Sequence, residues 1–216
     1  MLIIESIKEK TSAIKIFSKK EVMFKKSAEQ KLIDTSYKKA INAVNGLITE
    51  IVNTCSQTNF VISPLIKERI TELLSACHNS SCKESVEIVD VNGITAKEKE
   101  VRSLLQYEWN SYYSRETASV EDVLNVVKGI ANVNITALLY KMRAAKTWNK
   151  DINVVIEMMN AISEANSLID KMKLTDTTVA FLRKVINKTA TLEDITDEVM
   201  SWLQAEGIKG KVKISF

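Results

Sequence analysis

Residues 33–51 read IDTSYKKAINAVNGLITEI, and their apolar side chains recur at alternating steps of four and three residues. That spacing is typical of an α-helix that packs along a partner helix. A second apolar line runs beside the first and widens the stripe, as in a bundle helix rather than a two-stranded coiled coil. The first line consists of Ile33, Tyr37, Ala40, Val44, Leu47 and Ile51, and the second of Ile41, Ile48, Val52 and Cys55.

The composition of the chain points the same way. Its 216 residues include one proline and five glycines. In average proteins, proline makes up about 5% of residues and glycine about 7%, so both are scarce here. Tight turns between strands depend on these two residues, so the composition favours long helices over sheets. The hydrophobic fraction of 45% and the charged fraction of 26% are those of a globular protein, and a chain of this length buries enough core to fold without disulfides.

Capping signals divide the rest of the chain into helices. Ser63 followed by Pro64 predicts a helix that runs to about Cys77, because serine caps a helix and proline suits its first position. The capping-box sequence Thr95–Glu98 predicts another that runs to about Tyr113. Further helix starts are expected at Ser119, Asn134, Asp151, Thr175 and Thr191, with the last helix ending at Gly207.

A second near-heptad seam follows Asp151 and invites an antiparallel partner helix. It comprises Val155, Met158, Ile162, Ala165, Leu168 or Ile169, and Met172. Together these patterns predict an all-α protein: an elongated multi-helix bundle, in one part or two, with at most one short C-terminal strand at residues 211–216. The expected parts are a long-helix region at 1–80 with a basic start and a helical bundle at 94–216, joined by a polar connector at about 78–94.

No stretch of the sequence approaches the length of a membrane-spanning apolar segment, and none has the form of a signal peptide. The three cysteines form an odd, sparse set, which fits a reducing compartment. We therefore expect a cytoplasmic protein without a transmembrane segment.

The sequence contains no recognisable catalytic or metal-binding motif. Cys77, His78 and Cys82 are zinc-type ligands, but a closed site needs a fourth ligand, and the chain offers only the distant Cys55 and no second histidine. We therefore expect one buried cysteine and an exposed histidine at a helix end. The five glycines never form a nucleotide-binding loop. Glu193 and Asp197, with their acidic neighbours, are one helical turn apart and suggest a cation site, or more simply a charged helix N-terminus. We expect no metal, no cofactor and no enzymatic activity.

Two features favour binding instead. Residues 1–42 carry ten lysines against five acidic residues, and within them Lys15, Lys19, Lys20, Lys25 and Lys26 interleave with apolar side chains. Such a segment suits sequence-independent contact with phosphate or with an acidic partner, although it is equally typical of a solvated helix face. The second feature is the aromatic cluster of Trp109, Tyr112 and Tyr113 with Arg115, which is typical of a protein interface or of a helical core.

The sequence thus leads to three hypotheses. The first is a non-catalytic interaction subunit, accessory or scaffold, that assembles with a protein partner or with itself. The second is an accessory nucleic-acid-binding subunit in a DNA- or RNA-handling complex that uses the lysine-rich N-terminal helix. The third is a helical hydrolase that depends on carboxylates and a cation. Salt-sensitive binding is expected only of the second, and stabilisation by a divalent cation only of the third.

Overall fold

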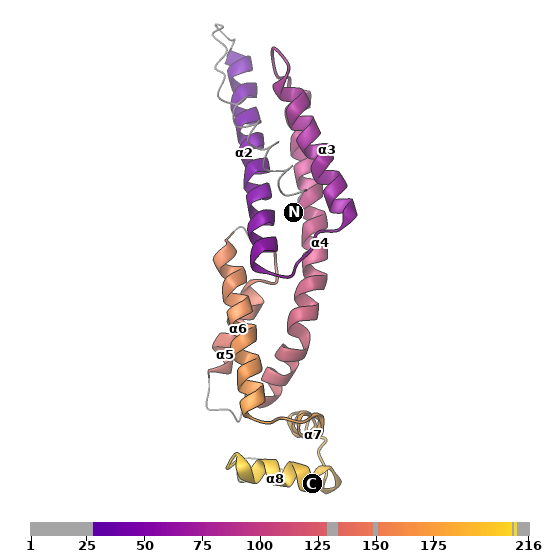
Figure 1. Ribbon diagram of the computed structural model, residues 1–216, viewed down its shortest axis with the longest axis vertical. Helices are drawn as coiled ribbons and strands as arrows, with labels where there is room; N and C mark the ends of the chain where they lie inside the picture. Colours follow the sequence, from indigo (N-terminus) through magenta and orange to yellow (C-terminus); the bar gives the residue numbers. More distant parts are fainter. Residues whose placement is uncertain (1–27, 129–133, 149–150, 209, 211–216) are drawn as a thin grey trace. The chain divides into compact units, whose positions relative to one another are not determined.

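The computed structural model describes residues 28–128, 134–148, 151–208 and 210. In these ranges the chain forms seven α-helices and one short 3-10 helix and contains no strand, which confirms the all-α fold class (Figure 1). The alternating segment at 211–216 lies outside the described residues. Among the described helices, none combines the length and the hydropathy that crossing a lipid bilayer requires.

The chain divides into two compact units. Among the described residues, unit 1 contains 28–110, 147, 148, 151 and 152, and unit 2 contains 111–128, 134–146, 153–208 and 210. One boundary therefore falls inside a helix, which differs from the expected parts at 1–80 and 94–216. The contacts place this boundary between Asn110 and Ser111 of one continuous helix, and the division at a polar connector stays a prediction.

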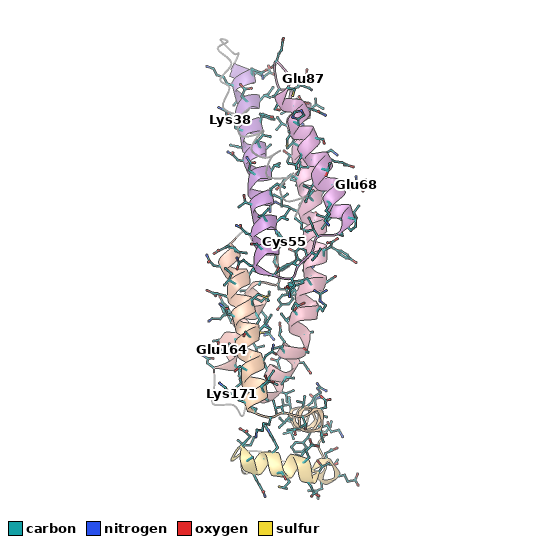
Figure 2. All side chains as sticks on the ribbon, viewed as in Figure 1. Lys38, Cys55, Glu68, Glu87, Glu164 and Lys171 are labelled. Carbon is teal, nitrogen blue, oxygen red and sulfur yellow. The ribbon has the colours of Figure 1, made fainter. Side chains whose placement is uncertain are left out.

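Unit 1 is built from α2 (Ala28–Gln57), α3 (Pro64–Ser81) and the first part of α4 (Ile88–Val127). The apolar stripe of residues 33–51 lies on the buried face of α2. Ala40, Val44, Leu47 and Ile51 are buried, and the two earlier members at 33 and 37 are half-buried. Ser63 caps α3 as expected, since its side chain accepts a hydrogen bond from the backbone N–H of Ile66. Charged side chains such as Lys38 lie on the exposed faces (Figure 2).

Helix α4 differs from the sequence expectation at both ends. It begins at Ile88 rather than Thr95, and the Thr95 hydroxyl donates to the carbonyl of Val91 instead of capping a helix start. It also continues through Ser119 to Val127, so the expected break there is absent. The capping-box sequence was misleading because the apolar side chains of Val91, one turn before Thr95, and of Ile94, directly before it, are already buried and hold this region in the helix. The expected connector at 78–94 is thus helical at both ends and irregular only between them.

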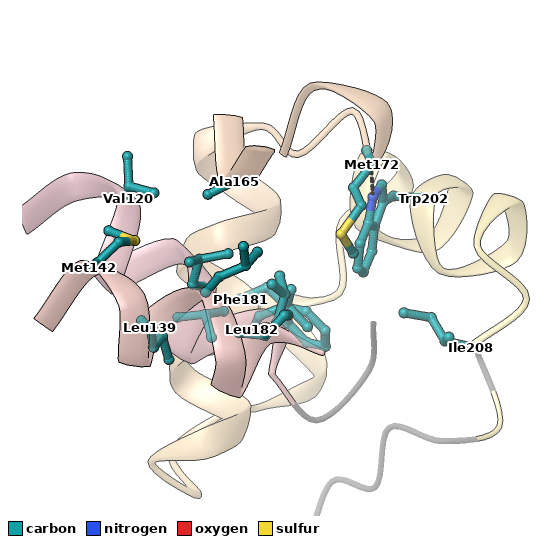
Figure 3. Packing of buried hydrophobic residues seen from close by; sticks show 14 of the residues in the cluster. Val120, Leu139, Met142, Ala165, Met172, Phe181, Leu182, Trp202 and Ile208 are labelled. Atoms are coloured by element: carbon teal, nitrogen blue, oxygen red, sulfur yellow. Dashed lines mark hydrogen bonds between the residues drawn. The ribbon is translucent and has the colours of Figure 1, made fainter. Parts of the chain in front are cut away.

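Unit 2 contains the second part of α4 with α5 (Ile135–Ala144), α6 (Ile152–Lys171), α7 (Asp176–Ile186), the 3-10 helix η1 (Leu192–Asp194) and α8 (Asp197–Ala205). Its core gathers side chains from all five α-helices, as Figure 3 shows for Val120, Met142, Ala165, Phe181 and Trp202. The expected α6 seam is largely buried: Val155, Met158, Ala165 and Met172 are buried and Ile162, Leu168 and Ile169 are half-buried.

The helix ends in unit 2 follow local capping rules with one exception. Thr175 caps α7 as expected, through a hydrogen bond from the backbone N–H of Thr178. Gly207 follows the end of α8 with a φ of 65°, as the C-terminal glycine signal predicts. Thr191, however, caps the 3-10 helix, and the N-cap of α8 is Thr196. Thr191 therefore begins a separate short turn, five residues before the N-cap of the helix that it was predicted to open.

Candidate functional site

Of the two predicted binding features, the structure describes only the aromatic cluster. Lys15, Lys19, Lys20, Lys25 and Lys26 lie outside the described residues, so the basic-segment hypothesis stays a prediction. The aromatic cluster is described, and its three rings are not surface residues: Trp109, Tyr112 and Tyr113 are at most 5% exposed. Of that set only Arg115 is exposed, with its guanidinium 5.2 Å from the centre of the Tyr112 ring. The cluster is therefore core within this chain, because these positions fall on the buried side of α4.

The partners of Trp109 come from distant parts of the sequence. Its ring meets Phe60 edge-on with centroids 5.4 Å apart, and it meets Trp148 in the same way at 5.6 Å. Phe60 and Trp148 complete the triangle at 5.8 Å. Edge-to-face pairs of this kind add to the free energy gained from burying the rings. This aromatic triad in unit 1 was not foreseen, because its members are separated by 49 and 39 positions in the sequence.

A buried charge network adjoins the aromatic triad. Glu50 of α2, only 8% exposed, accepts a hydrogen bond of 2.8 Å from the Arg102 guanidinium of α4 and one of 3.2 Å from the indole N–H of Trp148. Glu98, one turn before Arg102, also pairs with that guanidinium. Two carboxylates around one guanidinium leave this network with a net negative charge. Its polar atoms are satisfied, because every buried polar side-chain atom in the described part of the chain has a hydrogen-bond partner. The network joins α2 to α4.

One sequence signal could have revealed this network. Glu98 occupies a seam position in the series Val91, Ile94, Glu98, Val101 and Leu105, where the spacing otherwise places only apolar side chains. A charged residue in such a seam is buried at a high cost unless it has a charged partner. Glu98 therefore implied a basic residue on its own helix or the neighbouring one. Its partner Glu50 could not be read in the same way, because the α2 pattern does not single it out.

A smaller polar group lies in unit 2. The Tyr113 hydroxyl donates a hydrogen bond of 2.6 Å to Glu121, whose other oxygen accepts one of 3.0 Å from Arg143 of α5. Burial, with the hydrogen bond to Glu121, raises the pKa of Tyr113 to about 12. The phenol thus keeps its proton at neutral pH and serves as a hydrogen-bond donor that fixes Glu121.

The Cys77–Cys82 region has the placement that the sequence predicts. Cys77 is fully buried and His78 is exposed near the end of α3. Burial raises the pKa of the Cys77 thiol to about 12, which makes it a poor nucleophile. Tyr37 of α2 donates a long hydrogen bond of 3.5 Å to the Cys77 carbonyl, and burial raises the pKa of this tyrosine to about 12 as well. Cys82, the residue after α3, is exposed, with its sulfur 3.8 Å from Nε2 of His78.

The acidic residues around α8 act as helix-end groups in the structure. Asp194 pairs with Lys184 of α7 and accepts a hydrogen bond of 2.8 Å from the backbone N–H of Thr191. These two interactions lower the pKa of Asp194. Glu193 and Asp197 are exposed, with Asp197 in the first turn of α8. Across the described residues, no three histidine, cysteine, aspartate or glutamate side chains are grouped so that they could hold a metal ion.

The surface of α6 carries a shallow, open hollow in unit 2. Its walls are all side chains of this one helix: the half-buried Met159 and Ile162 and the exposed Ser163, Asn166, Ser167, Asp170 and Lys171, the last of which is labelled in Figure 2. An enzyme pocket is usually enclosed by several elements with convergent polar groups. This hollow has neither property, and it is better described as an uncovered helix face.

Comparison with known proteins finds no matching family model, no matching curated protein and no matching solved structure. The class that the fold itself defines is an all-α helical protein whose described residues form two compact units.

Proposed function

We propose that this protein is a helical interaction subunit, accessory or scaffold, that binds a protein partner or a second copy of itself. The observation that supports the proposal is the presence of three exposed apolar side chains near one end of unit 1. Gln30 of α2 donates a hydrogen bond of 3.0 Å to the Val86 carbonyl, which brings the first turn of α2 beside the residues that precede α4. Three exposed apolar residues lie within three positions of this contact: Leu32, Ile88 and Val89.

These three residues, which we call the apolar end of unit 1, are between 52% and 70% exposed. An isolated exposed apolar side chain is ordinary on any protein surface. A group of them at one end of a helical unit is a more specific feature, because contact with a partner removes their surface from water. A cytoplasmic location is part of the proposal, since all three cysteines are free thiols, as expected in a reducing compartment.

The proposal is tested by capturing the tagged full chain from its native cells with and without nuclease treatment. We expect a stoichiometric protein partner, or a second copy, that resists nuclease. Val89→Asp should abolish the capture, whereas Leu192→Asp in unit 2 is a matched control because both side chains are 64% exposed. Circular dichroism verifies that both variants fold.

Two outcomes would contradict the proposal. Recovery of the wild-type chain alone, as a monomer, would contradict the proposed interaction function. Recovery of nucleic acid in a salt-sensitive complex would favour the lysine-rich N-terminal segment as the binding element. Replacing five lysines of that segment together by Glu would then abolish the complex. These are Lys15, Lys19, Lys20, Lys25 and Lys26.

A further inference from the structure

The exposed pair His78 and Cys82 lies at the C-terminal end of α3. These residues are four positions apart, so the helix places both side chains on one face. The Sγ atom of Cys82 lies 3.8 Å from Nε2 of His78. Both side chains are exposed, which leaves the space beyond the two donor atoms open to solvent.

The distance between these two atoms is close to the one that a bound zinc ion requires. Zinc takes thiolate sulfur at about 2.3 Å and imidazole nitrogen at about 2.0–2.1 Å, so two such ligands at a tetrahedral angle are roughly 3.6 Å apart. A side-chain adjustment of a few tenths of an ångström would seat the ion. The soft sulfur and the imidazole together suit thiophilic ions with a filled d shell.

The electrostatic surroundings also suit a cation. His78 lies in the last turn of α3 and Cys82 is its C-cap, where the helix dipole presents its negative end. The nearest basic neighbour in sequence, Lys83, is paired with Asp90 at 2.7 Å, which offsets its charge. Glu84 and Glu87, the other charged residues before α4, are exposed and acidic.

We propose that His78 and Cys82 form an open, two-ligand site for a thiophilic cation of the Zn²⁺ type. This differs from the closed site that the sequence argument considered, because two protein ligands leave the other coordination positions to water. The inference does not rest on the interaction function proposed above.

The test is titration of the reduced full chain with Zn²⁺ alone, read by competition with a chromophoric indicator. Titration with Cd²⁺ gives a second reading, since a cadmium–thiolate bond adds an ultraviolet charge-transfer band. We expect one ion per chain. Both Cys82→Ser and His78→Gln should weaken binding by at least the roughly 10–100-fold that loss of an outer-shell partner causes.

The matched control is Cys55→Ser, which removes the other cysteine that is not fully buried and should leave binding and the cadmium band unchanged. His78 and Cys82 are exposed, so their variants should keep the wild-type circular dichroism. Absence of Zn²⁺ binding below millimolar concentration would overturn the proposal. Binding that either Cys82→Ser or His78→Gln leaves intact would also overturn it, because the ion would then lie elsewhere.

Discussion

Two lysines in unit 2 adopt a backbone conformation that favours glycine. Lys173 and Lys188 have φ values of 48° and 57° and follow the ends of α6 and α7. After α7, the backbone N–H of Thr189 donates to Lys184 and that of Lys188 to Val185, which is the hydrogen-bond pattern that a C-terminal glycine usually closes. The left-handed conformation is unfavourable for a residue with a Cβ atom, so Lys188 holds a strained position.

Lys188→Gly should therefore raise the free energy of unfolding by about 0.5–1 kcal/mol, because glycine adopts positive φ without steric cost. Urea denaturation measures the change. The converse control is Gly207→Ala at the same position after α8, where no atom lies within 4 Å of an added Cβ and only the φ of +65° is unfavourable. Gly207→Ala should lower stability by a similar amount, and a Lys188→Gly variant less stable than wild type would contradict the argument.

Tyr113 makes stability depend on alkaline pH. Its pKa is about 12 in the fold and about 10 in an unfolded chain. Between these values the unfolded state has lost the phenol proton while the folded state keeps it, so the folded state binds more protons and stability falls as pH rises. Burial raises the pKa of Tyr37 by the same amount. It also raises the pKa of Cys77 from 9.0 to about 12, so the pH range over which stability falls begins near pH 9.

Tyr113→Phe should reduce that alkaline loss of stability by about 1–3 kcal/mol at pH 12. The measurement is urea denaturation at a series of pH values from 8 to 12, roughly the range over which these groups titrate. Tyr107→Phe is the control, since Tyr107 is 74% exposed. A Tyr113→Phe variant whose stability falls with pH as steeply as that of the wild type would show that this phenol does not contribute.

At the scale of elements, α4 is the helix that departs most from local sequence signals. Gly93 lies inside its first two turns and is exposed, and nothing lies within 4 Å of an added Cβ. Glycine inside a helix costs roughly 0.5–1 kcal/mol relative to alanine. The sequence pattern instead predicted that Gly93 lies in a connector at about 78–94, before a helix start at Thr95.

Gly93→Ala distinguishes a helix that begins at Ile88 from one that begins at Thr95. We expect the substitution to raise the free energy of unfolding by about 0.5–1 kcal/mol, because alanine favours the helix. Gly46→Ala within α2 is the positive control, since an added Cβ would lie at an ordinary 4.0 Å from the Glu50 side chain. If Gly46→Ala raised stability in thermal denaturation and Gly93→Ala did not, the start of α4 would lie later in the chain.

At the scale of the whole molecule, the described residues form two cores rather than one. Phe181 and Trp202 belong to the core of unit 2, where the Trp202 indole donates a 2.7 Å hydrogen bond to the Met172 carbonyl (Figure 3). Trp109 and Trp148 belong to the aromatic triad of unit 1. The three tryptophans of the chain therefore report on the two units separately.

Phe181→Ala should destabilise unit 2 by about 3–5 kcal/mol, because the ring is 2% exposed and its removal leaves a cavity. In a chain labelled with fluorotryptophan, the fluorine resonance of Trp202 should then reach its unfolded position at a lower urea concentration than those of Trp109 and Trp148. Phe60→Ala should reverse the order. Coincident transitions in both variants would show that the two units unfold as one.

The amino-acid sequence by itself determined the all-α class, the buried faces of α2 and α6, and the caps at Ser63, Thr175 and Gly207. These features depend on residues within one or two helical turns, where periodicity and backbone hydrogen bonding act locally. The sequence also predicted one buried cysteine and an exposed histidine at the end of α3.

Only the tertiary structure decided which aromatic residues are buried, where α4 begins and ends, and which charges meet. Trp109 is core because Phe60 and Trp148 pack against it, and Glu50 is buried because Arg102 and Trp148 pair with it. These partners lie 39 to 98 positions apart in the sequence. Local periodicity carries no information about pairings at that separation, since they arise from the way the helices pack.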